Sequence, residues 1–488
     1  MNVYQKIKIS AHKNLAAPAF ISSQGCITYG HFLSLIALAS KELHRRGVVK
    51  GDVVGITINH VIFHSAIVIS LAQLGAVSLS LQSKMPALEY GNRIKRFGVR
   101  HVVRSSDIPN ILNVNNIEFA KISFAEDQHA FDLAQEGLVE PETKDSARFL
   151  LTSGSTGASQ AVLHTQGSWV ERVARTVDEI DENSRVILPD INSTLGNVFL
   201  LGSLFAGATL IIARTDAYRE LISDINAYAA THLIFPPHVL LGMMPHLPRR
   251  GMAFPTVKHL RPVGSSLSKG LLNDLLSRMS PNVYYPYGIS EVGAISIATP
   301  SMLKLYPDTS GKVKSWSKAE IVDEHGKAMQ SNQVGQIRVS VEGMPKEYYR
   351  EPVVSKEKFR DGWFYSSDQG FINDEGYLFI QGRMDDLINI DGRKINPAQL
   401  EAQLINSSSI SECAIFISEI KEKKLLFGAF VANKDQITKA LSSNLQLKEL
   451  IQDRYFSVDA LPRNDNGKVL RRDLPSLFSK EILKKYPN

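Results

Sequence analysis

The stretch Leu150–Gly157 has the sequence LLTSGSTG, and it limits the possible folds of this 488-residue chain more than any other segment. An apolar, strand-like run over residues 147–151 leads directly into a loop of glycines and hydroxyl-bearing residues. Glycine lets a backbone approach a phosphate closely, and consecutive N–H groups with Ser and Thr hydroxyls bind its oxygens. The segment therefore predicts a phosphate-binding loop after a buried strand. It is not a Walker P-loop, because no Gly-Lys-Ser/Thr follows at that spacing. A plain surface turn is the alternative.

Helix-like and strand-like segments alternate on the N-terminal side of this loop. An amphipathic helix is predicted over residues 32–46, a buried strand over 52–58, a helix over 59–74 that stops at Gly75, and a strand over 76–81. Such alternation is typical of a layered α/β architecture with mostly parallel strands.

The composition changes after about residue 382, where a turn-rich, glycine-rich stretch ends. Beyond it the pattern favours two helices and two strands, which suffice for a small α+β domain of roughly 100 residues. The helices are predicted over 397–404 and 438–451, and the strands over 412–418 and 425–431. We therefore expect a large N-terminal α/β domain, residues 1–382, and a small, mobile α+β C-terminal domain, residues 383–488.

Charge and cysteine usage exclude several classes of protein. The net charge is +6, and the basic residues are scattered rather than gathered with aromatics on one face, so no nucleic-acid partner is expected. Cys26 and Cys413 form neither a disulfide framework nor a metal-binding spacing. The N-terminus lacks a signal-peptide core, and polar residues interrupt the most apolar stretch, residues 61–81. We expect a cytoplasmic protein without membrane insertion.

Three further motifs carry chemically useful side chains. In Tyr284–Glu291, YYPYGISE, an aromatic ring suited to stacking on a base precedes a hydroxyl and a carboxylate suited to Mg²⁺. Asp368 ends GWFYSSD, and Arg383 lies in GRMDD; such a pair suits the hydroxyls of a ribose. In residues 461–471, LPRNDNGKVLR, an Asn-Gly turn presents a lysine to a reacting phosphate. Taken singly, each also fits a strand end, a solvated ion pair or an exposed turn.

In their order and spacing the four motifs resemble the adenylate-forming superfamily, which comprises acyl-CoA synthetases, nonribosomal-peptide adenylation domains and firefly luciferase. The resemblance covers about residues 27–474 and is closest in character to acyl- and aryl-CoA ligases. It implies that ATP activates a carboxylic acid as an acyl-adenylate, with Mg²⁺, and that the acyl group then passes to a thiol. Coenzyme A is the expected acceptor. A phosphopantetheinyl acyl carrier protein and a degenerate, non-catalytic nucleotide-binding protein are the alternatives.

The resemblance also implies a role for each matching residue. The loop would bind the β- and γ-phosphates, Gly264 and Ser265 would lie against the adenine, and Tyr287, followed by Gly288, would cover its other face. Ser290 would contact the α-phosphate, and Asp368 with Arg383 would bind the ribose. Glu291 would hold Mg²⁺ and Lys468 would act in catalysis, while Asp385 would be the hinge and Gly392 would lie in the loop that receives the acceptor. The phosphate-loop residues are Thr152, Ser153, Gly154, Ser155, Thr156 and Gly157.

Two positions depart from the family pattern. Where the loop usually continues with Pro, Lys and Gly, this chain has Ser159, Gln160 and Ala161. Loss of that lysine removes a charge-assisted phosphate contact worth about 1.5–3 kcal/mol, or roughly ten- to a hundredfold in affinity. An ungapped alignment places Thr194 where amino-acid-activating relatives carry an aspartate, which favours an acid without an α-amino group. A shifted alignment would instead place Asp190 at that position. The identity of the acid and the oligomeric state remain open.

Overall fold

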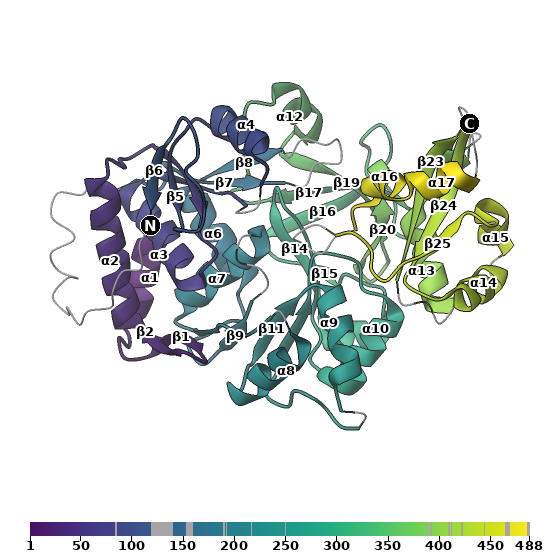
Figure 1. The fold of residues 1–488 in the computed structure, drawn as a ribbon, viewed down its shortest axis with the longest axis horizontal. Coiled ribbons are helices and arrows are strands. Elements are labelled where there is room, and N and C mark those ends of the chain that lie inside the picture. The colour runs from purple at the N-terminus through teal and green to yellow at the C-terminus, as the bar shows by residue number, and fades with distance from the viewer. Residues whose placement is uncertain are drawn as a thin grey trace.

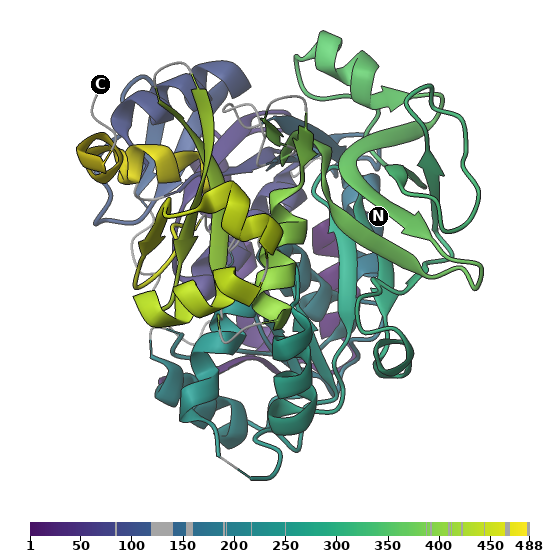
Figure 2. The same cartoon turned by 90° about the vertical axis from the view of Figure 1, so that its right-hand side faces the viewer.

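The structure is a computed structural model of the 488-residue chain. The residues that it describes are 1–82, 85–118, 140–152, 160–188, 191, 193–215, 217–248, 250–386, 388–390, 393–407, 410, 412–420, 423–443, 445–463 and 469–485. Figure 1 shows the N-terminal elements at one end of the molecule and the C-terminal elements at the other. The view in Figure 2 looks onto the C-terminal elements, which lie in front of the larger N-terminal part.

The first of two six-stranded sheets has the order β6-β5-β3-β4-β7-β8. Neighbouring strands are parallel except that β8 runs antiparallel to β7. The strands predicted over 52–58, 76–81 and 147–151 are confirmed as members of this sheet. Its strands are β3 (Val53–Thr57), β4 (Val77–Ser80), β5 (Val99–Arg104), β6 (Asn115–Glu118), β7 (Ser146–Leu151) and β8 (Ala161–Thr165).

The second six-stranded sheet has the order β12-β11-β9-β10-β1-β2 and is parallel except for the hairpin partner β2. The mostly parallel, layered α/β architecture predicted from the alternating segments is therefore confirmed. Its strands are β1 (Pro18–Ser22), β2 (Gly25–Thr28), β9 (Arg185–Ile187), β10 (Thr209–Ile211), β11 (His232–Phe235) and β12 (His259–Pro262).

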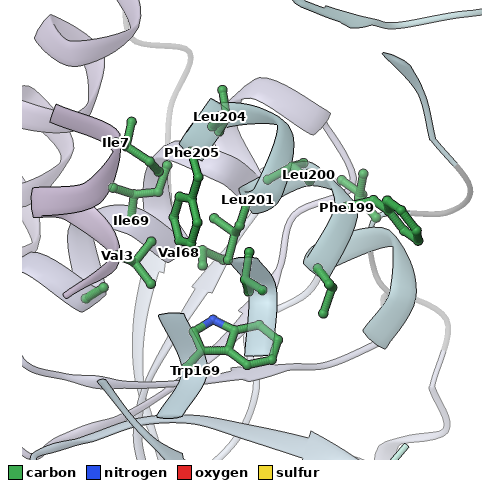
Figure 3. Close-up of a cluster of buried hydrophobic side chains, with 14 of the residues drawn as sticks. Val3, Ile7, Val68, Ile69, Trp169, Phe199, Leu200, Leu201, Leu204 and Phe205 are labelled. Atoms are coloured by element: carbon green, nitrogen blue, oxygen red, sulfur yellow. The ribbon is translucent and has the colours of Figure 1, made fainter. Parts of the chain in front are cut away.

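A layer of helices joins these two sheets. Helix α3 (Val61–Leu74) contacts β4 of the first sheet, α7 (Thr194–Ala206) contacts β10 of the second, and α1 (Val3–Ala11) contacts both helices. Because α3 and α7 are apolar on nearly every face, they are stable only when buried on all sides. Figure 3 shows the resulting core, to which Trp169 of α6 (Gln166–Thr176) also contributes.

The predicted helix boundaries in this layer hold closely. Helix α2 (Tyr29–Arg45) occupies the segment predicted over 32–46. Helix α3 ends where Gly75 adopts a left-handed conformation with φ 69°, which glycine tolerates without strain. The other α-helices among the described N-terminal residues are α4 (Ala87–Phe97), α8 (Tyr218–Ala227), α9 (Pro237–Met243), α10 (Lys269–Asp274), α11 (Pro300–Leu305) and α12 (Pro352–Lys358).

Two antiparallel sheets connect the N-terminal layers to the C-terminal part. One has the order β13-β14-β15, and the other has the order β16-β17-β19-β18 with β20 paired to β19. These strands carry the second and third sequence motifs. They are β13 (Tyr285–Ile289), β14 (Gly293–Ala298), β15 (Lys312–Val313), β16 (Ser317–Val322), β17 (Gly335–Val341), β18 (Phe359–Arg360), β19 (Trp363–Ile372) and β20 (Leu378–Arg383).

The C-terminal part has buried clusters of its own. Two of them draw only on residues from Ile395 onward, whereas the clusters of the layered part draw on none beyond Ile380. Its elements are β21 (Ile388–Ile390), β22 (Arg393–Ile395), α13 (Pro397–Ser407), β23 (Cys413–Ile420), β24 (Lys423–Phe430), α14 (Lys434–Ser443), α15 (Leu445–Ile451), β25 (Tyr455–Ser457), α16 (Leu474–Leu477) and α17 (Ser479–Lys485).

The two C-terminal strands and the first helix lie where the sequence predicted them. The single helix predicted over 438–451 is wrong, because two helices, α14 and α15, occupy this region. Ser442 and Ser443 close α14, and serine competes for backbone hydrogen bonds, so it favours helix ends over helix interiors.

Candidate active site

A cavity of about 1540 Å³ lies between the layered part and the C-terminal part. Its wall includes every predicted site residue that the structure describes, although these residues come from segments far apart in the sequence. They are Thr152, Gly264, Ser265, Tyr287, Gly288, Ser290, Glu291, Asp368, Arg383 and Asp385. The predicted residues Ser153, Gly154, Ser155, Thr156, Gly157, Gly392 and Lys468 lie outside the described residues.

Two strands from different sheets bring the predicted base-binding and ribose-binding side chains together. Tyr287 on β13 donates a hydrogen bond from its Oη to Oδ2 of Asp368 on β19, over 2.7 Å. Burial, together with the nearby charge of Asp368, raises the pKa of Tyr287 well above its ordinary value, so the phenol stays a donor. This bond holds the Tyr287 ring and one carboxylate oxygen of Asp368 in a fixed orientation at the cavity wall.

The pairing of β19 with β20 places Arg383 beside Asp368. The two residues are cross-strand partners, and side chains of such partners on one face lie close together. Arg383 Nη2 also lies 3.1 Å from Oδ2 of Asp385, which follows β20 in a short 3₁₀ turn, Met384–Asp386. The carboxylate of Asp368 and the guanidinium of Arg383 thus offer acceptors and donors at one edge of the cavity.

Glu291 is held by two residues that sequence reasoning missed. Tyr348 Oη donates to Glu291 Oε1 over 2.7 Å, and Arg172 Nη1 donates to the Glu291 carbonyl over 3.3 Å. Burial raises the pKa of Glu291, and the Tyr348 hydrogen bond opposes that shift. Burial lowers the pKa of Arg172 to about 10, and nearby Glu291 opposes that shift.

One signal in the sequence marks Arg172. It follows Trp169 by three residues in α6, so the two side chains share a helix face, and Trp169 is buried. A charge on a buried helix face is rare unless it is paired or functional. Tyr348 belongs to none of the sequence motifs, and only the tertiary structure brings it into contact with Glu291.

The ends of the phosphate loop pair with each other. The Thr152 N–H donates to the Gln160 carbonyl over 2.8 Å, so the residues on either side of 153–159 are joined. Thr152 Oγ1, Arg172 Nε and Arg383 Nε are buried and have no hydrogen-bond partner among the described residues. Buried polar atoms rarely stay unpaired in native proteins. Three of them at one cavity suit an oxygen-rich anion such as a triphosphate, and the carboxylate of Glu291 is a ligand that Mg²⁺ accepts.

Another part of the cavity wall is mainly apolar. Ser193 begins helix α7 by accepting a hydrogen bond from Gly196 N–H over 3.0 Å. The first turns of α7 then present Thr194, Leu195, Val198 and Phe199 to the cavity, and Thr194 is the neutral residue singled out in the sequence. Apolar walls with few polar groups are usual for small-molecule pockets.

Ion pairs of the C-terminal part close the opposite wall. Arg471 Nη2 lies 2.8 Å from Oε1 of Glu401 on α13, and Arg471 Nη1 lies 3.4 Å from Oδ2 of Asp386. Arg463 and Val469 both line the cavity and form an antiparallel bridge. The bridge joins the two residues that flank 464–468, the segment with the predicted catalytic lysine.

Residues 7–349 match the family model described as AMP-binding enzyme. This match covers more than half of the chain, and the chain belongs to that family. The predicted membership in the adenylate-forming superfamily is confirmed, as is its enzyme class, ATP-dependent activation of an acid. No helix in the described part of the chain is long and apolar enough to cross a membrane.

Individual relatives agree with this assignment. The chain is 26% identical to 4-coumarate–CoA ligase 3 of Oryza sativa subsp. japonica over 503 residues, 94% of this chain and 89% of that protein. It is 24% identical to 2-succinylbenzoate–CoA ligase of Geobacillus sp. (strain WCH70) over 475 residues, 94% of each chain. O-succinylbenzoate coenzyme A synthetase MenE of Bacillus subtilis, solved with AMP, matches with a TM-score of 0.81 at 20% identity, over 97% of this chain and 98% of that chain. The predicted fold class, a large N-terminal and a smaller C-terminal domain, is confirmed.

Proposed function

We propose that this chain is an AMP-forming acid–CoA ligase that activates a carboxylic acid lacking an α-amino group. The observation that carries the proposal is the shared cavity, in which the Tyr287–Asp368 pair and Glu291 face the same space as the apolar wall of α7. A nucleotide and an apolar acid bound there would meet in one enclosure. The relatives named as CoA ligases support coenzyme A as the acceptor.

The first half-reaction joins two anions. A carboxylate oxygen of the acid attacks the α-phosphorus of ATP, the bond to the bridging oxygen breaks, and pyrophosphate leaves. Tyr287 and Asp368 orient the nucleoside, while Ser290 and the loop from Thr152 bind the phosphates. Glu291 would hold Mg²⁺, which would supply positive charge to the phosphates. Lys468 adds positive charge at the point where negative charge develops in the transition state. Such a contact accelerates the step more than one that stabilises substrate and transition state equally.

The second half-reaction needs a different arrangement of the C-terminal part. A thiolate sulfur attacks the acyl carbon, the bond to the phosphate oxygen breaks, and AMP leaves. We propose that residues 383–488 rotate about Asp385 between the two steps, which withdraws Lys468 and brings Gly392 to the site. The separate buried clusters on either side of this boundary support two bodies that move as units. Free thiols at Cys26 and Cys413 suit a reducing compartment such as the cytoplasm.

Pyrophosphate exchange tests the activation step directly. The purified chain, given Mg²⁺, labelled pyrophosphate and single acids, should return label to ATP with at least one aryl or fatty acid. Amino acids should give none, because no carboxylate at Thr194 binds their ammonium group. Absence of exchange across all three classes of acid would contradict the enzyme and leave a non-catalytic nucleotide-binding protein.

The acceptor is tested after an active acid is found. Coenzyme A should convert the adenylate into the acyl-CoA thioester, which mass spectrometry identifies. A phosphopantetheinylated carrier protein serves as the competing acceptor at equal concentration. If the carrier protein is loaded faster than coenzyme A, the proposal that coenzyme A is the acceptor is wrong and the carrier protein takes its place.

Gln160→Lys should tighten ATP binding by about tenfold or more. The lysine restores a charge-assisted phosphate contact, whose lower bound of about 1.5 kcal/mol corresponds to roughly one decade. Gln160 lines the cavity, so the new ammonium group would lie at its wall. Isothermal titration with ATP measures the change, and Gln160→Met is the uncharged control. Equal affinities for the lysine and methionine variants would show that other charges already compensate.

A further inference from the structure

Glu179, His232 and His259 form a cluster that is not part of the proposed active site. His232 begins β11 and His259 begins β12, and the two are register partners in the parallel sheet. Glu179 lies between α6 and β9, and one donor atom from each of the three residues lies within 4.8 Å of the others. None of the three is among the residues that line the large cavity.

The two imidazoles have nitrogen atoms without a partner. His232 Nε2 and His259 Nδ1 are buried, and neither has a hydrogen-bond partner among the described residues. The whole of His232 is 3% exposed. Buried polar atoms rarely stay unpaired in native proteins, so two of them close to a carboxylate point to a place where a ligand could bind.

Neighbouring side chains hold two of the three residues in place. Thr231 Oγ1 lies 2.8 Å from His232 Nδ1, which leaves Nε2 as the available nitrogen. Arg261 Nη2 lies 2.5 Å from Glu179 Oε1 and so anchors the carboxylate. Such outer contacts orient metal ligands and set which imidazole nitrogen binds.

We propose that Glu179, His232 and His259 bind a divalent transition-metal cation of the Zn²⁺ class. Two imidazoles and one carboxylate are a ligand set that Zn²⁺ prefers, whereas Mg²⁺ and Ca²⁺ prefer oxygen ligands alone. The ion would tie the segment before β9 to β11 and β12 and so brace the edge of the second sheet. Water completes the coordination.

Metal binding must reorient the rings. The rings of His232 and His259 are stacked, with centroids 4.7 Å apart and planes within 3°, and His259 also stacks on Tyr284. The lone pair of an imidazole nitrogen lies in the plane of its ring. In two parallel stacked rings these lone pairs lie in parallel planes, so they do not meet at one metal ion. A rotation about the Cβ–Cγ bond directs them at a shared ion and loosens the stack, so both imidazoles should shift in an NMR spectrum.

Calorimetric titration of the full chain with Zn²⁺ tests the site. Protein stripped of metal by EDTA and dialysed, without ATP, should bind one Zn²⁺ per chain at a saturable site. Glu179→Gln and His259→Gln should each weaken that binding tenfold or more, as loss of a ligand does. His325→Gln is the matched control, because His325 is exposed and lies far from the cluster in the sequence. Zn²⁺ should also raise the unfolding temperature of the wild type more than that of either variant.

Two results would overturn the proposal. One is wild-type Zn²⁺ binding that neither variant weakens, which assigns the ion to adventitious surface histidines. The other is the absence of saturable binding at micromolar Zn²⁺, which leaves the three residues as a packing stack. Circular dichroism without metal checks folding, and if His259→Gln unfolds, the nearly isosteric Glu179→Gln carries the test alone.

Discussion

Lys468→Ala should reduce pyrophosphate exchange by roughly a thousandfold, the largest loss expected of any single substitution in this chain. Removal of one group that stabilises developing charge in a transition state typically costs 10²–10³ in rate. Because both reactants, the carboxylate and ATP, are anions, the positive charge of Lys468 should have a large effect on the rate. The flanking residues Arg463 and Val469 line the cavity, which is consistent with the proposed role of Lys468 there.

The two half-reactions separate a catalytic from a structural effect of this lysine. Since the proposed rotation withdraws Lys468 before thiol attack, the variant should still transfer acyl groups from a synthetic acyl-adenylate to coenzyme A. Lys480→Ala is the control, because Lys480 is an exposed lysine of the same C-terminal part. Equal losses in both half-reactions would indicate a misfolded C-terminal part rather than a missing charge.

Asp368→Ala should raise the KM for ATP roughly a hundredfold, the second largest effect expected. The carboxylate would accept from two ribose hydroxyls, and two charge-assisted bonds at the lower bound of about 1.5 kcal/mol each give about two decades. The substitution also leaves the hydroxyl of Tyr287 without its 2.7 Å acceptor. Isothermal titration with ATP, together with steady-state kinetics, measures the loss.

A second variant separates the contact with ribose from the contact with Tyr287. Tyr287→Phe removes only the hydroxyl and keeps the ring, so it should weaken ATP binding by about tenfold or less, as loss of one hydrogen bond does. Asp374→Ala is the matched control, since Asp374 is exposed and its carboxylate pairs with Asn332 instead. Unchanged ATP affinity in Asp368→Ala would remove Asp368 from the nucleotide site.

Much of the fold could be predicted because its signals are local. The apolar run over 147–151, the helix that stops at Gly75 and the strands over 52–58 and 76–81 all depend on neighbouring residues, and all were found. The single helix predicted over 438–451 was wrong, because two helices, Lys434–Ser443 and Leu445–Ile451, occupy this region. Local propensity predicts whether a segment is a helix or a strand better than it predicts whether that segment forms one helix or two.

The nucleotide-binding candidates could be identified from spacing, but their contacts could not. Tyr287 and Asp368 are separated by 81 residues, and nothing in either motif shows that their side chains meet. Tyr348 and Arg172 were missed because their contacts with Glu291 cross between elements far apart in the chain.

By itself the sequence determined most of the predicted elements, the family and the chemical types of the candidate site residues, since each depends on residue identity and on short-range order. Only the tertiary structure decided which side chains share a cavity and which share a cluster. Glu179, His232 and His259 illustrate the difference, because no metal-binding spacing links them. Their proximity comes from the pairing of β11 with β12 and from the packing of the segment before β9, and strand pairing brings together residues at any sequence separation.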